Sequence, residues 1–228
     1  MYGYYGYDIY YLIYLLPGML LAMYAQAKIK HNFDTYSRIY NSKGLTGAET
    51  ADMILRGNDI RDVRIERVKG SLTDHYDPVN RVLRLSETVY GSESIAALGV
   101  AAHEAGHAIQ HHTQYVPLKL RNAIVPAANI GSNFSFLLVF LGLFASNTLL
   151  KWGIALFAIT VLFQLLTLPV EYNASRRAKA ILSEGILSRE EMVGVEKVLS
   201  AAALTYVASL VAAIGTLLRF LSFDRRRD

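Results

Sequence analysis

Two histidines and a glutamate stand at a spacing that suits metal-dependent hydrolysis. The segment Ala102-His103-Glu104-Ala105-Gly106-His107 contains the pattern H-E-x-x-H. On a helix, residues four apart share a face, so His103 and His107 can bind one metal ion, while Glu104 is offset and can reach a water on that metal. Zinc lowers the pKa of such a water to about 7, and a nearby carboxylate can take its proton as it attacks a carbonyl. The pattern therefore predicts zinc on the two histidines, with Glu104 as the general base.

A third protein ligand is expected, because a catalytic zinc usually has three and one open position. His111 is a poor candidate, since it lies about 12 Å along the helix axis from His103. Glu171 is a better one, because it directly follows a long apolar run, where a carboxylate without a partner is costly. A simple ion pair with Arg176 or Arg177 is the alternative explanation for Glu171.

Composition places these residues in a membrane protein. The chain has 228 residues, of which 53% are hydrophobic and 18% charged. Its mean hydropathy of +0.25 is too high for an ordinary soluble domain, and the apolar residues gather in long runs. No basic tract is interleaved with aromatic residues, which disfavours nucleic-acid binding. Cysteine is absent, so any metal must be held by histidines and carboxylates.

Four apolar runs, at about 9–27, 123–144, 149–170 and 198–221, are long enough to cross a bilayer as helices. The first is predicted to be an uncleaved anchor. A signal peptide is the competing interpretation, because Ala25-Gln26-Ala27 resembles a cleavage site, but residues 1–8 carry no Lys or Arg. Pro169 is expected to end the helix of the third run, so that Glu171 begins a new helical stretch.

The polar stretch 28–122 predicts a small α+β domain. Thr46 and Glu49 form the pattern of a capping box, and Asp77-Pro78-Val79-Asn80 is typical of a hairpin turn. The predicted elements are a short helix at 34–40, a helix from Thr46 to about Arg56, a strand at 63–68, a hairpin of 71–77 with 80–85, and a helix at about 93–112 that carries H-E-x-x-H.

These elements predict a mainly α membrane protein, with about four transmembrane helices and an inserted α+β domain. The predicted division has three parts. They are an N-terminal transmembrane anchor (1–27), a zinc-peptidase domain with the H-E-x-x-H helix (28–122), and a transmembrane region that carries the third zinc ligand (123–228).

Three stretches resemble the YugP-type family of membrane zinc metallopeptidases: 71–78 (SLTDHYDP), 101–110 (AAHEAGHAIQ) and 168–178 (LPVEYNASRRA). The resemblance covers nearly the whole chain in the same order. More distantly, the chain is similar to the membrane gluzincins, among them the heat-shock-type membrane peptidases and the CAAX prenyl endopeptidases, which carry H-E-x-x-H followed by E-F/Y-x-A-D. The resemblance implies a gluzincin-like domain, with His103, His107 and Glu171 as ligands of one zinc ion and Glu104 as base.

Ser175 departs from the distant relatives, which have Asp at this position behind the metal ligands. A hydroxyl can take that place, but it orients a ligand more weakly than a carboxylate. His75 and Tyr76 lie near the tip of the predicted hairpin. In this kind of fold a strand edge beside the metal can hold an extended peptide, and either side chain could stabilise an oxyanion. The alternative is a turn held by Asp side chains, with His75 merely exposed.

Basic residues predict the orientation. Those at 28–30 and 176–179 follow the first and third runs, and the positive-inside rule puts both groups in the cytoplasm. The active site would then face the cytoplasm. Four full crossings would send the arginines of 225–227 outside, which the rule disfavours, so either the last run does not fully cross or the orientation is reversed.

The sequence thus predicts a multi-pass cell-membrane zinc endopeptidase that hydrolyses peptide bonds near the membrane surface. Its partners would be the lipid bilayer and a protein or peptide substrate, with a regulatory membrane partner left open. The alternative is a zinc-containing membrane scaffold or regulatory binding protein without turnover. A small transporter is disfavoured, because Glu171 lies at the edge of a run rather than in its middle.

Overall fold

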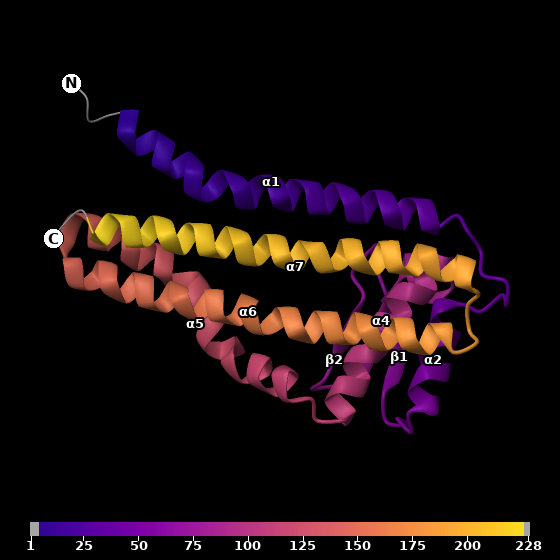
Figure 1. Ribbon diagram of the computed structural model, residues 1–228. Helices are drawn as coiled ribbons and strands as arrows, with labels where there is room; N and C mark the ends of the chain where they lie inside the picture. Colours follow the sequence, from indigo (N-terminus) through magenta and orange to yellow (C-terminus); the bar gives the residue numbers. More distant parts are fainter. Residues whose placement is uncertain (1–4, 226–228) are drawn as a thin grey trace. The chain divides into compact units, whose positions relative to one another are not determined.

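The computed structural model describes residues 5–225, and Arg226 and Arg227 lie outside them. Helices dominate the described chain, with three short strands between them (Figure 1). The strands are β1 (Arg64–Val68), β2 (His75–Asp77) and β3 (Val82–Ser86). The helices are α1 (Tyr5–Tyr36), α2 (Gly47–Gly57), α3 (Glu87–Tyr90), α4 (Ile95–His112), α5 (Val116–Ala145), α6 (Asn147–Ser183) and α7 (Arg189–Asp224).

The chain divides into two compact units, each built from segments far apart in sequence. The first, called here the helical unit, comprises the described residues 5–26, 119–169 and 204–225. The second, called the mixed unit, comprises 27–118 and 170–203. The predicted division into 1–27, 28–122 and 123–228 concerns function and stays a prediction.

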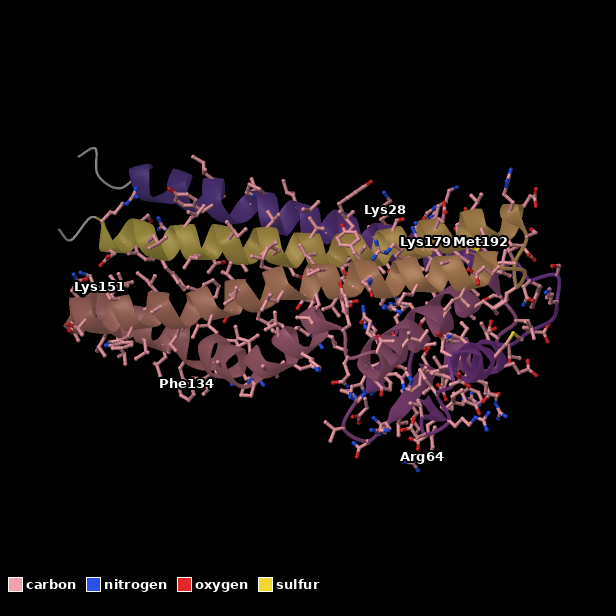
Figure 2. All side chains as sticks on the ribbon, turned by 60° about the horizontal axis from the view of Figure 1, so that its bottom comes forward. Lys28, Arg64, Phe134, Lys151, Lys179 and Met192 are labelled. Carbon is pink, nitrogen blue, oxygen red and sulfur yellow. The ribbon has the colours of Figure 1, made fainter. Side chains whose placement is uncertain are left out.

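Among the described residues, four helices are long and apolar enough to cross a membrane, as predicted: α1 from Leu12, α5, α6 and α7. In the helical unit, the rings of Phe136, Phe157 and Phe220 meet edge to face, with centroids 5.1–5.6 Å apart. Large apolar side chains also remain uncovered, such as Phe134, which is 51% exposed (Figure 2). Lipid contact explains such an apolar surface better than water does.

The mixed unit holds a three-stranded sheet of order β1-β3-β2. β2 pairs antiparallel with β3, which confirms the predicted hairpin, and β1 pairs parallel with the other side of β3. Asp77 Oδ1 accepts hydrogen bonds from the backbone N–H groups of Val79 and Asn80, so the turn is stabilised by its own side chain. Leu83 and Leu85 of the central strand are completely buried, as the alternation predicted.

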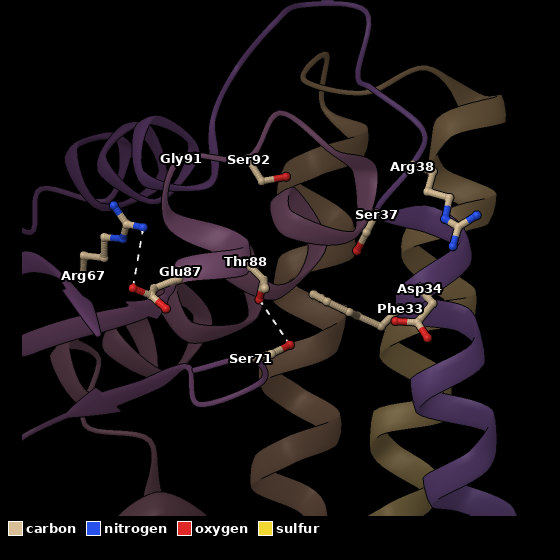
Figure 3. Close-up of a pocket in the computed structure, with 10 residues that line it drawn as sticks. All are labelled: Phe33, Asp34, Ser37, Arg38, Arg67, Ser71, Glu87, Thr88, Gly91 and Ser92. Atoms are coloured by element: carbon tan, nitrogen blue, oxygen red, sulfur yellow. Dashed lines mark hydrogen bonds and ion pairs between the residues drawn. The ribbon is translucent and has the colours of Figure 1, made fainter. Parts of the chain in front are cut away.

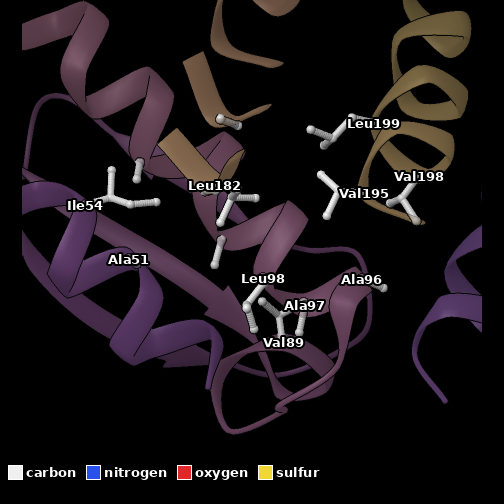
Figure 4. Packing of buried hydrophobic residues seen from close by; sticks show 14 of the residues in the cluster. Ala51, Ile54, Val89, Ala96, Ala97, Leu98, Leu182, Val195, Val198 and Leu199 are labelled. Atoms are coloured by element: carbon white, nitrogen blue, oxygen red, sulfur yellow. The ribbon is translucent and has the colours of Figure 1, made fainter. Parts of the chain in front are cut away.

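Small and branched apolar residues fill the core of the mixed unit. Ala97 and Leu98 of α4 are fully buried among residues of α2, α6 and α7, including Ile54, Leu182 and Val195 (Figure 4). The predicted capping box is confirmed, and a second cap accompanies it. Thr46 and Glu49 make a capping box at the start of α2, and Ser94 Oγ accepts from Ala97 N to cap α4. Both caps fix where these helices begin.

Two predicted helix boundaries were wrong. The separate short helix at 34–40 does not exist, because α1 continues without a break to Tyr36; no Gly or Pro lies between Ala27 and Tyr36 to end it. Pro169 likewise lies inside α6, which runs on to Ser183. A proline removes one helical hydrogen bond, but long apolar helices tolerate that loss when other groups satisfy the backbone. Glu171 is therefore an interior residue of a continuous helix.

Candidate metal centre

The close approach of α4 to the second half of α6 creates the candidate site. A Cβ built on Gly106 would lie only 2.9 Å from the carbonyl oxygen of Ala174, so only glycine allows this separation. Gly106 lies within H-E-x-x-H, between the two histidines, and Ala174 lies one turn after Glu171. The contact thus brings the motif of α4 against the carboxylate of α6.

Three side chains meet at this contact. Nε2 of His103 lies 3.2 Å from Oε2 of Glu171, and Nε2 of His107 lies 3.5 Å from the same oxygen. The two rings are nearly perpendicular, with centroids 4.8 Å apart. One ligand atom from each residue lies within 4.8 Å of the others. The structure therefore brings together the three residues that the sequence predicted as metal ligands.

The second ring nitrogen of each histidine contacts a neutral polar side chain. Nδ1 of His103 lies 3.0 Å from Oγ of Ser175, and Nδ1 of His107 lies 3.0 Å from Oε1 of Gln110. Ser175 thus contacts a predicted ligand, and its role in orienting that ligand stays a prediction. Sequence reasoning missed Gln110. The available signal was a polar residue within the apolar face of α4, three residues after His107.

Glu171 faces the histidines and not an arginine. The alternative partner Arg177 donates through Nε to Oδ1 of Asn173 at 2.9 Å. Arg176 is exposed. The Glu171 side chain is only 6% exposed, and a buried carboxylate requires a positively polarised partner.

The site carries strong negative potential. Burial acts to lower the pKa of His107, but the hydrogen bond and charge of Glu171, together with the charge of Glu104, raise this pKa to about 9. Glu104 is buried and follows His103 directly, as the predicted base should. A histidine pKa raised by two neighbouring carboxylates is typical of a centre that favours a cation.

His75 and Tyr76 make their hydrogen bonds with residues outside this trio. His75 is exposed, and its Nδ1 lies 2.9 Å from the carbonyl oxygen of Thr73. The hydroxyl of Tyr76 lies 2.8 Å from Nδ1 of His111. The contact with Tyr76 gives His111 a role in joining β2 to α4, and burial is the main cause of its lowered pKa. Substrate contacts by His75 or Tyr76 stay a prediction.

The mixed unit also contains a polar pocket of about 580 Å³ that includes none of the metal-site residues (Figure 3). Arg67 and Glu87 face each other across 3.7 Å in it, and Thr88 donates to Ser71 at 3.4 Å. Its lining carries both signs of charge and several hydroxyls. This mixture selects no single class of ligand.

The donor set of the trio fits zinc. Two imidazole nitrogens and one carboxylate oxygen are the three-ligand combination of many catalytic zinc sites, and they leave one position open. Carboxylate and imidazole ligands without thiolate also agree with the absence of cysteine.

Comparison with known proteins now assigns the class. The chain belongs to the family described as "Putative neutral zinc metallopeptidase", whose model matches residues 11–225. It is also similar to the "Putative membrane protease YugP" of Bacillus subtilis (strain 168), with 54% identity over 204 residues, which cover 88% of this chain and 90% of that protein. No solved structure matches the chain with statistical significance. With its four apolar helices, the protein is a multi-pass membrane member of a zinc peptidase family.

Proposed function

We propose that this protein is a zinc-dependent membrane endopeptidase with one catalytic ion on His103, His107 and Glu171. The observation that carries the proposal is the buried cluster of these three ligand atoms within 4.8 Å of one another, with Glu104 beside His103. Family membership supports the same activity. The finer fold proposal, a gluzincin-like domain in the mixed unit, rests on H-E-x-x-H on α4 followed by the ligand on α6.

The chain's own residues can divide the chemistry between them. Zinc, when bound, would polarise a scissile carbonyl and make a water acidic enough to be deprotonated near neutral pH. Glu104 accepts the proton of the attacking water and later donates it to the leaving amine. His103 and His107 each direct Nε2 toward the site and hold Nδ1 against a polar neighbour, which keeps both rings fixed.

The proposal is tested by Glu104→Gln in purified full-length protein. The amide keeps the shape of the side chain but cannot accept the proton, so zinc content should stay at that of the wild type, while cleavage of casein or of a membrane-protein substrate should fall by at least about a hundredfold. Glu93→Gln is the matched control, because Glu93 is exposed and lies just before α4; it should cleave normally.

Two outcomes would contradict the proposal. Unchanged cleavage by Glu104→Gln would remove Glu104 as base. A wild-type protein with tightly bound zinc and no proteolysis across many substrates would favour the alternative, a zinc-containing membrane scaffold or regulatory binding protein. The neutral Ser175 behind His103 is the feature that would fit this alternative, because it makes that ligand a weaker electron donor.

The proposed site faces the cytoplasm, near the membrane surface. Two features support this placement: α6 carries the apolar run and Glu171 in one helix, and basic residues at 28–30 and 176–179 follow two of the runs. The chain has no cysteine, so a single Ser71→Cys variant offers one thiol on an exposed loop of the mixed unit. A membrane-impermeant maleimide should label it only in broken cells. Labelling in intact cells would mean that the mixed unit lies outside the cell and that the proposed orientation is wrong.

A further inference from the structure

Gln110 is an unusual residue for the interior of the mixed unit. It lies on α4, three residues after His107, and its side chain is completely buried. Burying an amide costs free energy unless its donors and acceptor are all satisfied. Its contacts are therefore expected to be complete and specific.

All hydrogen-bonding groups of the Gln110 amide have a partner. Nε2 donates to the carbonyl oxygen of Val170 at 2.8 Å and to Oδ1 of Asn173 at 3.0 Å. Both hydrogens of the amide nitrogen are thereby used, and both partners can only accept. A flipped amide would place its oxygen against those two acceptors, so the orientation is fixed by the network.

The orientation of Asn173 is fixed in the same way. Its Oδ1 accepts from Gln110 Nε2 and also from Nε of Arg177 at 2.9 Å. A guanidinium can only donate, so the oxygen of Asn173 must lie on this side. The chain of contacts therefore runs in one direction, from Arg177 through Asn173 to Gln110.

This chain of contacts leaves Oε1 of Gln110 pointing at Nδ1 of His107, 3.0 Å away. An amide oxygen can only accept, so Nδ1 must carry a hydrogen. The lone pair of the neutral ring then lies on Nε2, the nitrogen that faces Glu171.

We propose that Gln110 is a positioning residue that fixes the metal-binding tautomer of His107, and that Asn173 and Arg177 fix Gln110. This inference rests on the proposed role of His107 as a zinc ligand. It also gives a role to two further residues of α6: Asn173 and Arg177 orient Gln110, which in turn holds His107 of α4. An amide suits this task because it holds the ring without adding charge to a site that already contains two glutamates.

The test compares Gln110→Met with Gln110→Glu and uses Gln114→Met as the matched control, all as full-length protein in detergent. Gln114 lies just past the end of α4 and is exposed, so its replacement should change nothing at the site. Zinc affinity is measured by competition with a chromophoric chelator. Gln110→Met should bind zinc about 10–100-fold more weakly than wild type, as expected for loss of a group that orients a ligand. Gln110→Glu keeps an acceptor for His107 but loses both donors to Val170 and Asn173, so its zinc affinity should lie between those of Gln110→Met and wild type.

A second readout separates positioning from mere packing. Histidine-selective ¹⁵N spectra of zinc-free protein, at a pH where the ring is neutral, should show His107 with its hydrogen on Nδ1 in wild type and Gln114→Met. In Gln110→Met the hydrogen should move largely to Nε2, because nothing holds it on Nδ1. Thermal unfolding of the zinc-free variants reports the loss of stability independently of zinc binding.

The outcomes separate the two proposals. If Gln110→Met unfolds earlier yet keeps the wild-type tautomer and zinc affinity, Gln110 only fills space and the inference is wrong. If wild type binds no zinc, the proposed function fails, while the tautomer measurement still decides whether Gln110 sets the ring.

Discussion

Both units bring helices into close contact through glycines, but they surround the contact with opposite chemistry. In the helical unit, a Cβ on Gly153 would lie 2.7 Å from the backbone nitrogen of Val139, and the neighbourhood is apolar, with Leu150 and Ile154 buried beside it. In the mixed unit, the contact of Gly106 with Ala174 lies beside two histidines and a buried carboxylate.

The difference shows what close packing achieves in each place. Among the apolar helices it gains van der Waals contact, and an isolated hydroxyl without a partner, such as that of Ser135 or Thr160, is tolerated. In the mixed unit the same closeness sets the distance between ligand atoms on α4 and α6. There Ser175 and Gln110, the polar side chains behind the two histidines, each have a specific partner, because a buried charge is far more costly than a buried hydroxyl.

The largest effect on the polar contact in the mixed unit is expected from removal of the Glu171 carboxylate. Glu171→Ala deletes one of three ligand atoms and leaves two histidines that α4 alone supplies, so we expect purified protein to lose its zinc, as His103→Ala should. The loss of affinity should exceed the roughly 10–100-fold typical of groups behind a ligand. Elemental analysis measures this directly. Glu196→Ala, an exposed change on α7, is the control. Full zinc retention by Glu171→Ala would refute the ligand assignment.

A change of pH should have the second largest effect on zinc binding by the three ligand residues. Because the pKa of His107 is raised from 6.5 to about 9 in the zinc-free protein, zinc must displace a proton at neutral pH. Apparent zinc affinity should therefore rise by up to about tenfold per pH unit as pH approaches 9 and then level off. The stability of the zinc-free fold should change in the opposite direction with pH. Protonated His107 contributes its whole stabilising free energy below pH 6.5, and this contribution is lost as pH rises through 9.

Calorimetry in buffers of different ionisation enthalpy measures the protons released on zinc binding. We expect about one proton at pH 7 from His107. Binding without proton release at pH 7 would contradict the raised pKa, although it would leave the ligand set intact.

The two glycine contacts can be compared by the same substitution. Gly106→Ala pushes a methyl group onto the backbone of Ala174, which should separate α4 from α6 and weaken zinc binding, at a packing cost of roughly 1–3 kcal/mol. Gly153→Ala meets a similar obstacle at Val139, and should lower the unfolding temperature without changing zinc affinity. Equal zinc affinity in Gly106→Ala and wild type would mean that this contact does not set the ligand distance.

The sequence predicted the parts of this molecule that local patterns encode. The capping box at Thr46, the hairpin through Asp77 and the four apolar helices follow from neighbouring residues, and H-E-x-x-H needs only the helical period. The continuous course of α6 through Pro169 was not predicted, because tolerance of a proline depends on what packs around it. Gln110 was missed for a related reason, since its partners lie about 60 residues away.

The parallel pairing of β1 with β3 likewise depends on contacts that no short pattern shows. A hairpin is fixed by its turn, but a parallel neighbour is fixed only by the fold around it. Local rules therefore identified which residues could act, while the partners that orient them required the tertiary structure.

The smallest expected effect concerns Ser175, whose hydroxyl contacts His103. The hydroxyl lies 3.0 Å from Nδ1 of His103 and is buried. Ser175→Ala removes a neutral hydrogen bond worth about 1 kcal/mol, so zinc affinity should fall by only about fivefold, less than in Gln110→Met. The chelator competition that measures Gln110 variants ranks the two directly. An effect of Ser175→Ala larger than that of Gln110→Met would mean that His103, and not His107, is the histidine whose orientation limits metal binding.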